Sequence, residues 1–167
     1  MKDHYHTKKL RILVGSRADA TSFYVSESTL QWLGIRLGDV IRINAINNSN
    51  HAIGCLLRKN LNFGEIEINK CIADTLEIYE DQEVDVNLIE PGHLVSIKLL
   101  PQTDKSLDTK FVLNQVVQPF FGKNYRAVRR GGLLDIKHKN QIYRFKILIT
   151  NPFDEGVVLP HTKIELV

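Results

Sequence analysis

Apolar and polar positions repeat along the first half of the chain with an offset of 43 residues and no gap. Residues 33–43, LGIRLGDVIRI, align with residues 76–86, LEIYEDQEVDV, and the match extends upstream into an apolar run in both copies. Within each copy, alternating apolar residues predict a strand, a stretch with one apolar side predicts a short helix, and a polar turn leads into a second strand. The pattern therefore predicts one strand–helix–strand unit that occurs twice.

Matched polar residues mark the start of each predicted helix. Ser26 in the first copy aligns with Asn69 in the second, and both residue types accept hydrogen bonds from the free amides of a first helical turn. Further along, Gly38 in the turn of the first copy aligns with Asp81 in the second. The same local signals thus recur at the same points of both copies.

Two more strands are expected at residues 10–14 and 52–57, one ahead of each strand–helix–strand unit. A unit of about 45 residues with two or three short strands cannot cover its own edges, whereas two such units can close a barrel that has none. The prediction is a mainly β (α+β) chain that begins with a pseudo-symmetric six-stranded barrel. Chance similarity between two ordinary units is the alternative.

A second unit is expected after Pro91 and Gly92, which interrupt the pattern. The predicted division is therefore residues 1–91 and residues 92–167. In the second part, the pattern predicts a strand at 94–101, a helix at 106–121 and strands at 133–137, 142–149, 156–160 and 163–167. Such an order of strand, helix and several strands is an α+β arrangement.

Periodicity in the second unit also predicts which side chains share a face. Pro119 is expected to end or kink the helix, because proline cannot donate a backbone hydrogen bond. The apolar positions expected to lie together are Val95, Ile97 and Leu99 in the first strand, Val112, Leu113, Val116, Val117 and Phe120 in the helix, and Tyr143, Phe145, Ile147 and Ile149 in a later strand.

Composition indicates an ordinary globular protein, with 43% apolar and 25% charged residues among 167. No apolar run approaches the roughly 20 residues that a membrane-spanning helix needs, and the start lacks a signal-peptide core. These features predict a cytoplasmic protein that does not enter a membrane. Cys55 and Cys71 form no CxxC pair, so both are expected to be reduced and packed.

The net charge of +3 is unevenly distributed along the chain. Residues 1–92 carry 10 basic and 13 acidic side chains, whereas residues 93–167 carry 12 and 6. The first part is thus net acidic and the second net basic, which agrees with two units that present different surfaces.

Taken in order, these features resemble the amino-terminal domain of the valosin-containing-protein class of AAA ATPases, archaeal relatives included. The resemblance covers nearly the whole chain. It is carried by LGIRLGDVIRI, IEINKCIADTLEIYEDQEVDV, IKLLPQTD, VVQPFF, NYRAVRRGGLLDIK and FKILITNPFDEGVVLPHTKIE. It implies a double-psi β-barrel followed by a smaller four-stranded barrel-like subdomain with one helix. The related membrane-fusion and peroxisomal AAA domains share this architecture.

The same resemblance implies a module that docks adaptors or substrates, ubiquitin-related ones among them, in a cleft between its two subdomains. An AAA ATPase ring, in cis or in trans, is a further implied partner. Carried over position by position, the cleft residues are Arg36, Leu37, Cys55, Leu57, His93 and Tyr125. Arg36 and His93 depart from the family, which often has an aromatic residue and a tyrosine there. Because histidine can change its charge within the physiological pH range, His93 suggests pH-dependent binding.

No catalytic or cofactor site is predicted. The chain has no G-x-x-x-x-G-K-[ST] loop, so it is expected neither to bind nor to hydrolyse nucleotide. The pair Gly131–Gly132 is interpreted as a turn before a strand. His4 and His6 have no third ligand nearby, so no metal is predicted.

Two rival functions remain open at this stage. Pyruvoyl-dependent aspartate decarboxylases, another double-psi barrel family, cut themselves at a Gly-Ser bond, and this chain contains Gly15–Ser16, which a simple turn also explains. The second rival is nucleic-acid binding by a basic face at residues 123–139. Its candidate residues are Lys123, Arg126, Arg129, Arg130, Lys137, His138 and Lys139, with Phe121 and Tyr125 as stacking rings.

Overall fold

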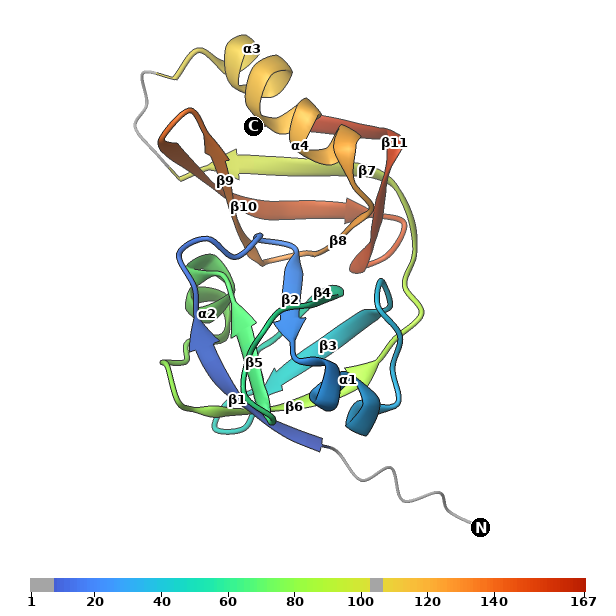
Figure 1. The fold of residues 1–167 in the computed structure, drawn as a ribbon. Helices are drawn as coiled ribbons and strands as arrows, with labels where there is room; N and C mark the ends of the chain where they lie inside the picture. The colour runs from blue at the N-terminus through green and yellow to red at the C-terminus, as the bar shows by residue number, and fades with distance from the viewer. Residues whose placement is uncertain (1–7, 103–106) are drawn as a thin grey trace.

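The computed structural model describes residues 8–102 and 107–167 and consists mainly of β-strands (Figure 1). The first unit is a closed barrel of six strands in the order β1-β5-β2-β4-β3-β6. Its strands are β1 (Lys8–Val14), β2 (Ser22–Val25), β3 (Val40–Ala45), β4 (His51–Arg58), β5 (Glu65–Ile68) and β6 (Glu83–Leu88), and its helices are α1 (Glu27–Leu33) and α2 (Lys70–Leu76).

The barrel confirms the predicted repeat. Adding the offset of 43 residues to the bounds of β2, α1 and β3 gives the bounds of β5, α2 and β6. The pairings also exchange: β1 runs parallel to β5 and antiparallel to β6, and β4 runs parallel to β2 and antiparallel to β3. Each copy thus lends its first strand to the other copy. This interleaved closed sheet is compatible with a double-psi barrel.

Caps explain why both short helices form where they do. The side chain of Ser26 accepts a hydrogen bond from the amide of Thr29, and that of Asn69 accepts one from the amide of Cys71. These side chains satisfy amides that have no partner within the helix. Both helices end at a left-handed residue, Gly34 in the first copy and Glu77 in the second. The repeat therefore preserves backbone conformation even where its residue types differ.

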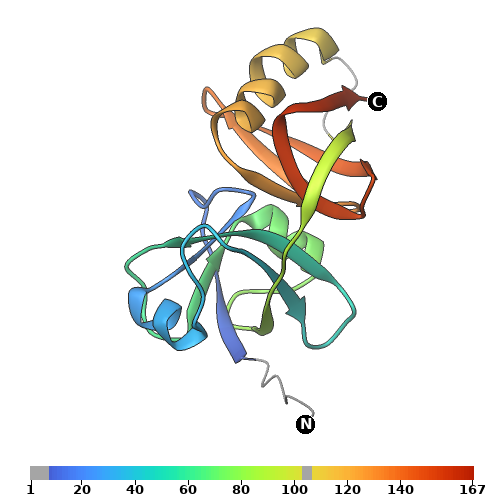
Figure 2. The ribbon, with the colours of Figure 1, turned by 90° about the vertical axis from the view of Figure 1, so that its right-hand side faces the viewer.

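The second unit is a five-stranded sheet in the order β8-β11-β7-β10-β9. The family resemblance implied four strands, whereas the pattern of the chain predicted five, two of them at other places. Figure 2 shows β7 leaving the barrel and running beside β11, with the sheet curled around a helical segment. The strands are β7 (Gly92–Pro101), β8 (Arg126–Arg129), β9 (Leu133–His138), β10 (Gln141–Asn151) and β11 (Glu155–Leu166).

Two differences separate the strands that the pattern predicted from those observed. The unpredicted strand, β8, lies in the basic stretch, where polar residues obscured the pattern. The strands expected at 156–160 and 163–167 form one strand, β11, whose register with β7 shifts between Val158 and Lys163. As expected, Gly131 and Gly132 form a turn, since Gly131 has a φ of 86° and β9 begins at Leu133.

Of the two effects expected of Pro119, an end of the helix is not observed. The helical segment continues through it as α3 (Thr109–Phe111), a π-helical turn η1 (Val112–Val117) and α4 (Gln118–Lys123). Pro119 stands in the first turn of α4, directly after the π-helical turn. The wider turn changes the hydrogen-bond pattern where the proline lacks a donor, so the chain can remain helical. The expected first residue of this helix, 106, lies outside the described residues.

Two predicted inward-facing side chains point to solvent instead. Val95 is exposed and its neighbour Leu94 is buried, because the pairing of β7 with β11 is irregular in this region. Ile149 is exposed and Thr150 is buried, because a register shift in β10 lies between Ile147 and Ile149. A bulge of one residue reverses the faces of every later side chain in a strand.

One apolar core continues from the barrel into the second unit. It includes Phe23 and Ile41 in the barrel and Phe145 and Ile97 in the second sheet, all with no exposed surface. The two units meet where α2 lies against β9 (Figure 1). Burial of shared apolar surface stabilises this junction.

Candidate functional site

A separate apolar cluster lies where the two units meet, and we call it the junction seam. It consists of five buried residues: Val40, Ile53 and Cys55 from the barrel, and Ala127 and Val157 from the second unit. The seam therefore joins β3 and β4 of the barrel to β8 and β11 of the second sheet.

The barrel contributes one face of β4 to the seam. Ile53, Cys55 and Leu57 alternate along the strand and so share a face. The first two are buried, whereas Leu57, further along, is 38% exposed. The segment that carries Arg36 and Leu37 runs beside this end of β4, because the amide of the next residue, Gly38, donates to the carbonyl oxygen of Leu56 at 2.8 Å. Leu57 and this segment therefore form the barrel side of the rim.

The second unit contributes a row of paired residues across three strands. Val157 in β11 pairs with Ala127 in β8 on one side and with His93 in β7 on the other. Directly paired residues point to the same face of a sheet, so His93 lies on the seam side. Tyr125 immediately precedes β8 and is 54% exposed, and its carbonyl oxygen is 3.6 Å from the thiol of Cys55.

The structure thus brings the six predicted residues to the surroundings of one apolar cluster. Cys55 lies inside the seam, and burial raises the pKa of its thiol. Five residues are exposed around it as the rim: Arg36, Leu37, Leu57, His93 and Tyr125. Burial and the neighbouring Cys55 also raise the pKa of the Tyr125 hydroxyl.

Ion pairs hold the two units together beside the seam. The Nη1 of Arg126 in β8 donates to both carboxylate oxygens of Asp19 at 2.7 Å and to the Oγ1 of Thr21 at 2.9 Å. The guanidinium of Arg126 also lies 3.5 Å from the ring centroid of Phe120. On another side, Glu155 pairs with Arg42 and Arg129. These contacts link positions far apart in sequence.

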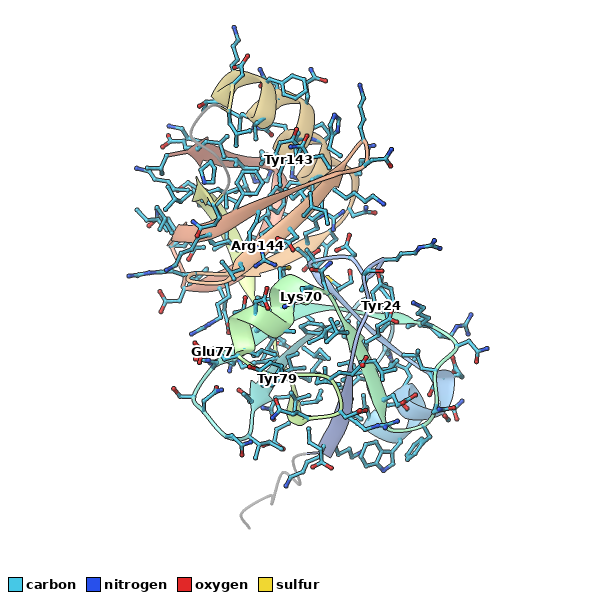
Figure 3. The ribbon with its side chains drawn as sticks, turned by 90° about the vertical axis from the view of Figure 1, so that its left-hand side faces the viewer. Tyr24, Lys70, Glu77, Tyr79, Tyr143 and Arg144 are labelled. Atoms are coloured by element: carbon cyan, nitrogen blue, oxygen red, sulfur yellow. The ribbon has the colours of Figure 1, made fainter. Side chains whose placement is uncertain are left out.

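Arg144 forms a second bridge between the units, from β10 to α2. Its Nε and Nη2 donate to Asp135 at 2.7 and 2.9 Å, and its Nη1 lies 2.8 Å from Asp74 in α2. Asp74 also pairs with Lys70, and Figure 3 shows Arg144 above Lys70 at the junction. Burial would raise the pKa of Asp74, but Lys70 and Arg144 hold it below its ordinary value.

Sequence reasoning missed a groove on the Asp19 side of the junction. It has a volume of about 720 Å³. Its walls are the β1–β2 loop from Ser16 to Ala20, the start of α2, and the outer face of the β9–β10 hairpin. None of the six predicted site residues lines it. Because its walls come from both units, no single stretch of sequence could have indicated it.

The basic stretch 123–139 does not form one continuous face. Arg126 is buried and bound to Asp19, Arg129 pairs with Glu155, and Arg130 lies 3.6 Å from Asp154. Phe121 is buried, so its ring is not offered to solvent, and Tyr125 is exposed at the seam. Three of the candidate cations are thus engaged by carboxylates of the same chain.

Other candidate chemistry is sparse in the part of the chain that the structure describes. Within residues 8–102 and 107–167, there is no group of three or more His, Cys, Asp or Glu side chains that could hold a metal ion. His4 and His6 lie outside these ranges. Gly15 directly follows the last residue of β1, and its amide donates to the carbonyl oxygen of Ile68 at 2.9 Å, in agreement with a structural turn.

Two further observations concern membrane association and family membership. Among the described residues, the helices are all too short or too polar to cross a bilayer. A scan against models of known protein families found none that matches this sequence.

Proposed function

We propose that this chain is a non-catalytic protein-docking module, similar to the amino-terminal domain of the valosin-containing-protein class of AAA ATPases. Its partner would be an adaptor or substrate protein that binds at the rim of the junction seam. The observation that carries the proposal is the placement of Leu57 and Tyr125. These apolar side chains come from different units and remain exposed beside the apolar cluster that joins the units.

The chemistry of the rim suits a protein partner. Leu37, Leu57 and Tyr125 supply exposed apolar area, and Arg36 and His93 add polar groups. Protein interfaces commonly have a few apolar or aromatic anchors surrounded by polar groups. Tyrosine is well suited to such a place, because its ring offers apolar area and its hydroxyl can remain hydrated. A loop or helix of a partner could therefore bury these anchors.

Several finer expectations depend on the family resemblance. It supports partners related to ubiquitin and an AAA ATPase ring in cis or in trans. The expectation that the chain does not hydrolyse nucleotide rests instead on its lack of a G-x-x-x-x-G-K-[ST] loop. Arg36 and His93 replace residue types that the family often has at these positions. A partner of this chain is therefore expected to offer a hydrogen-bond acceptor to Arg36.

Nucleic-acid binding is the alternative function, but the surroundings of its candidate residues support it less well than they support protein docking. Neutralising several phosphates requires cations that are free to contact them. Arg126, Arg129 and Arg130 already pair with carboxylates of this chain. Lys123, Lys137 and Lys139 are exposed, and they come from different elements of the second unit.

A pair of surface variants tests the docking site. The seam variant carries Tyr125→Ala and Leu57→Asp, and the matched control carries Tyr79→Ala and Ile46→Asp, which change exposed side chains away from the seam. Each is used with the unaltered chain for affinity capture from nuclease-treated source lysate, and circular dichroism checks that all three are folded. Captured proteins are identified, purified and titrated calorimetrically.

If the proposal holds, some proteins will be captured by both the unaltered chain and the control but not by the seam variant. It also expects direct binding of a purified partner to weaken at least about tenfold, as for loss of a buried anchor. Equal capture by all three would refute the seam rim as a docking site. Recovery mainly of nucleic acid from untreated lysate, lost as salt rises, would establish the alternative.

A further inference from the structure

The groove beside Asp19 has a charge pattern that the seam rim lacks. Five cationic side chains line it, together with two carboxylates, those of Asp19 and Asp135. Because both carboxylates are occupied by arginines at 2.7 Å, the remaining positive charge faces a ligand. The groove therefore favours a negatively charged occupant.

The cations have two different roles. Arg126 and Arg144 are held in the walls by Asp19, Asp135 and Asp74, and Lys70 also pairs with Asp74. Arg17 and Lys137 are exposed, and within the described residues neither forms an ion pair. They stand on opposite units, one in the β1–β2 loop and one in β9. The fixed arginines shape the groove, and the two exposed cations are available to a ligand.

Apolar groups accompany these charges. Ile142 in β10 is among the most exposed large apolar side chains of the hairpin, and Ala18 and Phe120 also line the groove. On the ring of Phe120, the guanidinium of Arg126 already occupies one face. That ring is therefore poorly placed to stack against a base, whereas Ile142 can be covered by an aliphatic side chain of a ligand.

We propose that this groove binds an acidic peptide segment of a partner protein, with carboxylates at Arg17 and Lys137 and an aliphatic side chain on Ile142. A volume of about 720 Å³ accommodates a few residues. The inference extends the proposed docking function to a second site, apart from the seam rim.

Direct titration tests this site without knowledge of the natural partner. The probe is a short fluorescein-labelled peptide in which glutamate and leucine alternate, and fluorescence anisotropy measures its binding at low salt. Comparison probes replace glutamate with glutamine or use a labelled single-stranded oligonucleotide. The groove variant is Arg17→Glu plus Lys137→Glu. The control, Lys123→Glu plus Lys139→Glu, makes the same change in net charge outside the groove.

The expected result is that the acidic peptide binds the unaltered chain and the control similarly and the groove variant at least about tenfold more weakly. Replacing Ile142 with serine should also weaken it, and the glutamine peptide should bind poorly. The seam variant, Tyr125→Ala plus Leu57→Asp, should bind the acidic peptide normally.

Four outcomes would overturn the inference. They are no binding of the acidic peptide, equal loss in the groove variant and the control, tighter binding of the oligonucleotide that depends on Arg17 and Lys137, and loss of peptide binding only in the seam variant. The last outcome would leave the proposed docking function standing and remove the groove alone. Loss of partner capture by the seam variant together with normal peptide binding is the result that both proposals expect. Equal capture by the seam variant, together with weakened peptide binding by the groove variant, would remove the seam rim and leave the groove.

Discussion

Arg126 and Asp19 tie the two units of this protein together, 107 positions apart in the chain. The Nη1 of Arg126 donates to both carboxylate oxygens of Asp19 at 2.7 Å, and the arginine side chain is only 8% exposed. The contact separates the seam from the groove: Tyr125 and Ala127, on either side of Arg126, lie at the seam, and Arg126 itself lines the groove. Both proposed sites therefore depend on it.

The losses of stability from removing the two members of this pair should not add. Asp19→Asn would leave a buried guanidinium without its counter-charge, so a loss of about 2–3 kcal/mol in the free energy of unfolding is expected. Arg126→Met should cost a similar amount, and the double variant less than the sum. Urea unfolding of the four proteins measures this. Strict additivity of the two losses would contradict the assigned interaction.

The same pair should make stability sensitive to acid. Burial would raise the pKa of Asp19, but the hydrogen bond and charge of Arg126, with hydrogen bonds from Thr21, hold it below its ordinary value of 3.8. Because the folded-state pKa is the lower one, this contribution to stability is present above 3.8 and is lost as pH falls through the folded-state pKa.

The stability difference between the unaltered chain and Asp19→Asn is therefore expected to be constant from neutral pH down to about pH 5 and to shrink below about pH 4. A protonated aspartate resembles asparagine, which is why the two proteins should converge. Urea midpoints at a series of pH values provide the measurement. A difference that persists unchanged in acid would show that the ionised carboxylate is not the source of the effect.

The repeat allows a prediction about backbone strain. Gly34 and Glu77 occupy equivalent positions after α1 and α2, with φ of 68° and 56°. A left-handed conformation costs a residue with a side chain roughly 1 kcal/mol relative to glycine. Since the Glu77 side chain is exposed, Glu77→Gly should raise the free energy of unfolding by about 0.5–1 kcal/mol.

The reverse substitution is the control for this effect. Gly34→Ala places a side chain in the same left-handed conformation and should lower the free energy of unfolding by about 1 kcal/mol. An added Cβ there meets no other atom within 4 Å, so steric overlap is not expected to contribute. Stabilisation by both substitutions, or by neither, would argue against conformational strain as the cause.

The two cysteines should report separately on the seam and on the core. Burial, with the nearby charge of Asp135, raises the pKa of Cys71 in α2 to about 12, and this residue has no exposed surface. Cys55 is 6% exposed and lies in the smaller seam cluster. Since the thiolate is the reactive form, neither should be alkylated readily in the native protein.

In mild denaturant, Cys55 should be alkylated before Cys71, because opening the seam exposes fewer apolar groups than unfolding the main core. Mass spectrometry of the labelled peptides at increasing urea distinguishes the two sites. Simultaneous labelling at the global transition would show that the seam does not open independently. Docking would then be limited to the exposed rim residues.

Much of the fold was predictable from neighbouring residues. The repeat, the caps at Ser26 and Asn69 and the six-stranded barrel depend on alternation, helical spacing and side-chain hydrogen bonds within a few positions. Strand β8 was missed because its arginines break the alternation, and Ile149 was placed on the wrong face because a bulge leaves no clear sign in the pattern.

The two proposed sites also differ in how far the sequence indicated them. Family resemblance, rather than periodicity, indicated residues such as Leu57 and Tyr125, and the structure places them on opposite units around one apolar cluster. The groove required the β1–β2 loop, α2 and the β9–β10 hairpin to be in place together.

The sequence by itself determined the local units, because residues close together in the chain specify turns, caps and strand faces. What only the tertiary structure decided was which distant groups meet. Arg126 could have been a free cation of a basic face, and it became the partner of Asp19 only when the two units packed together. Ion pairing and burial depend on distance in space, which a pattern of neighbouring residues does not encode.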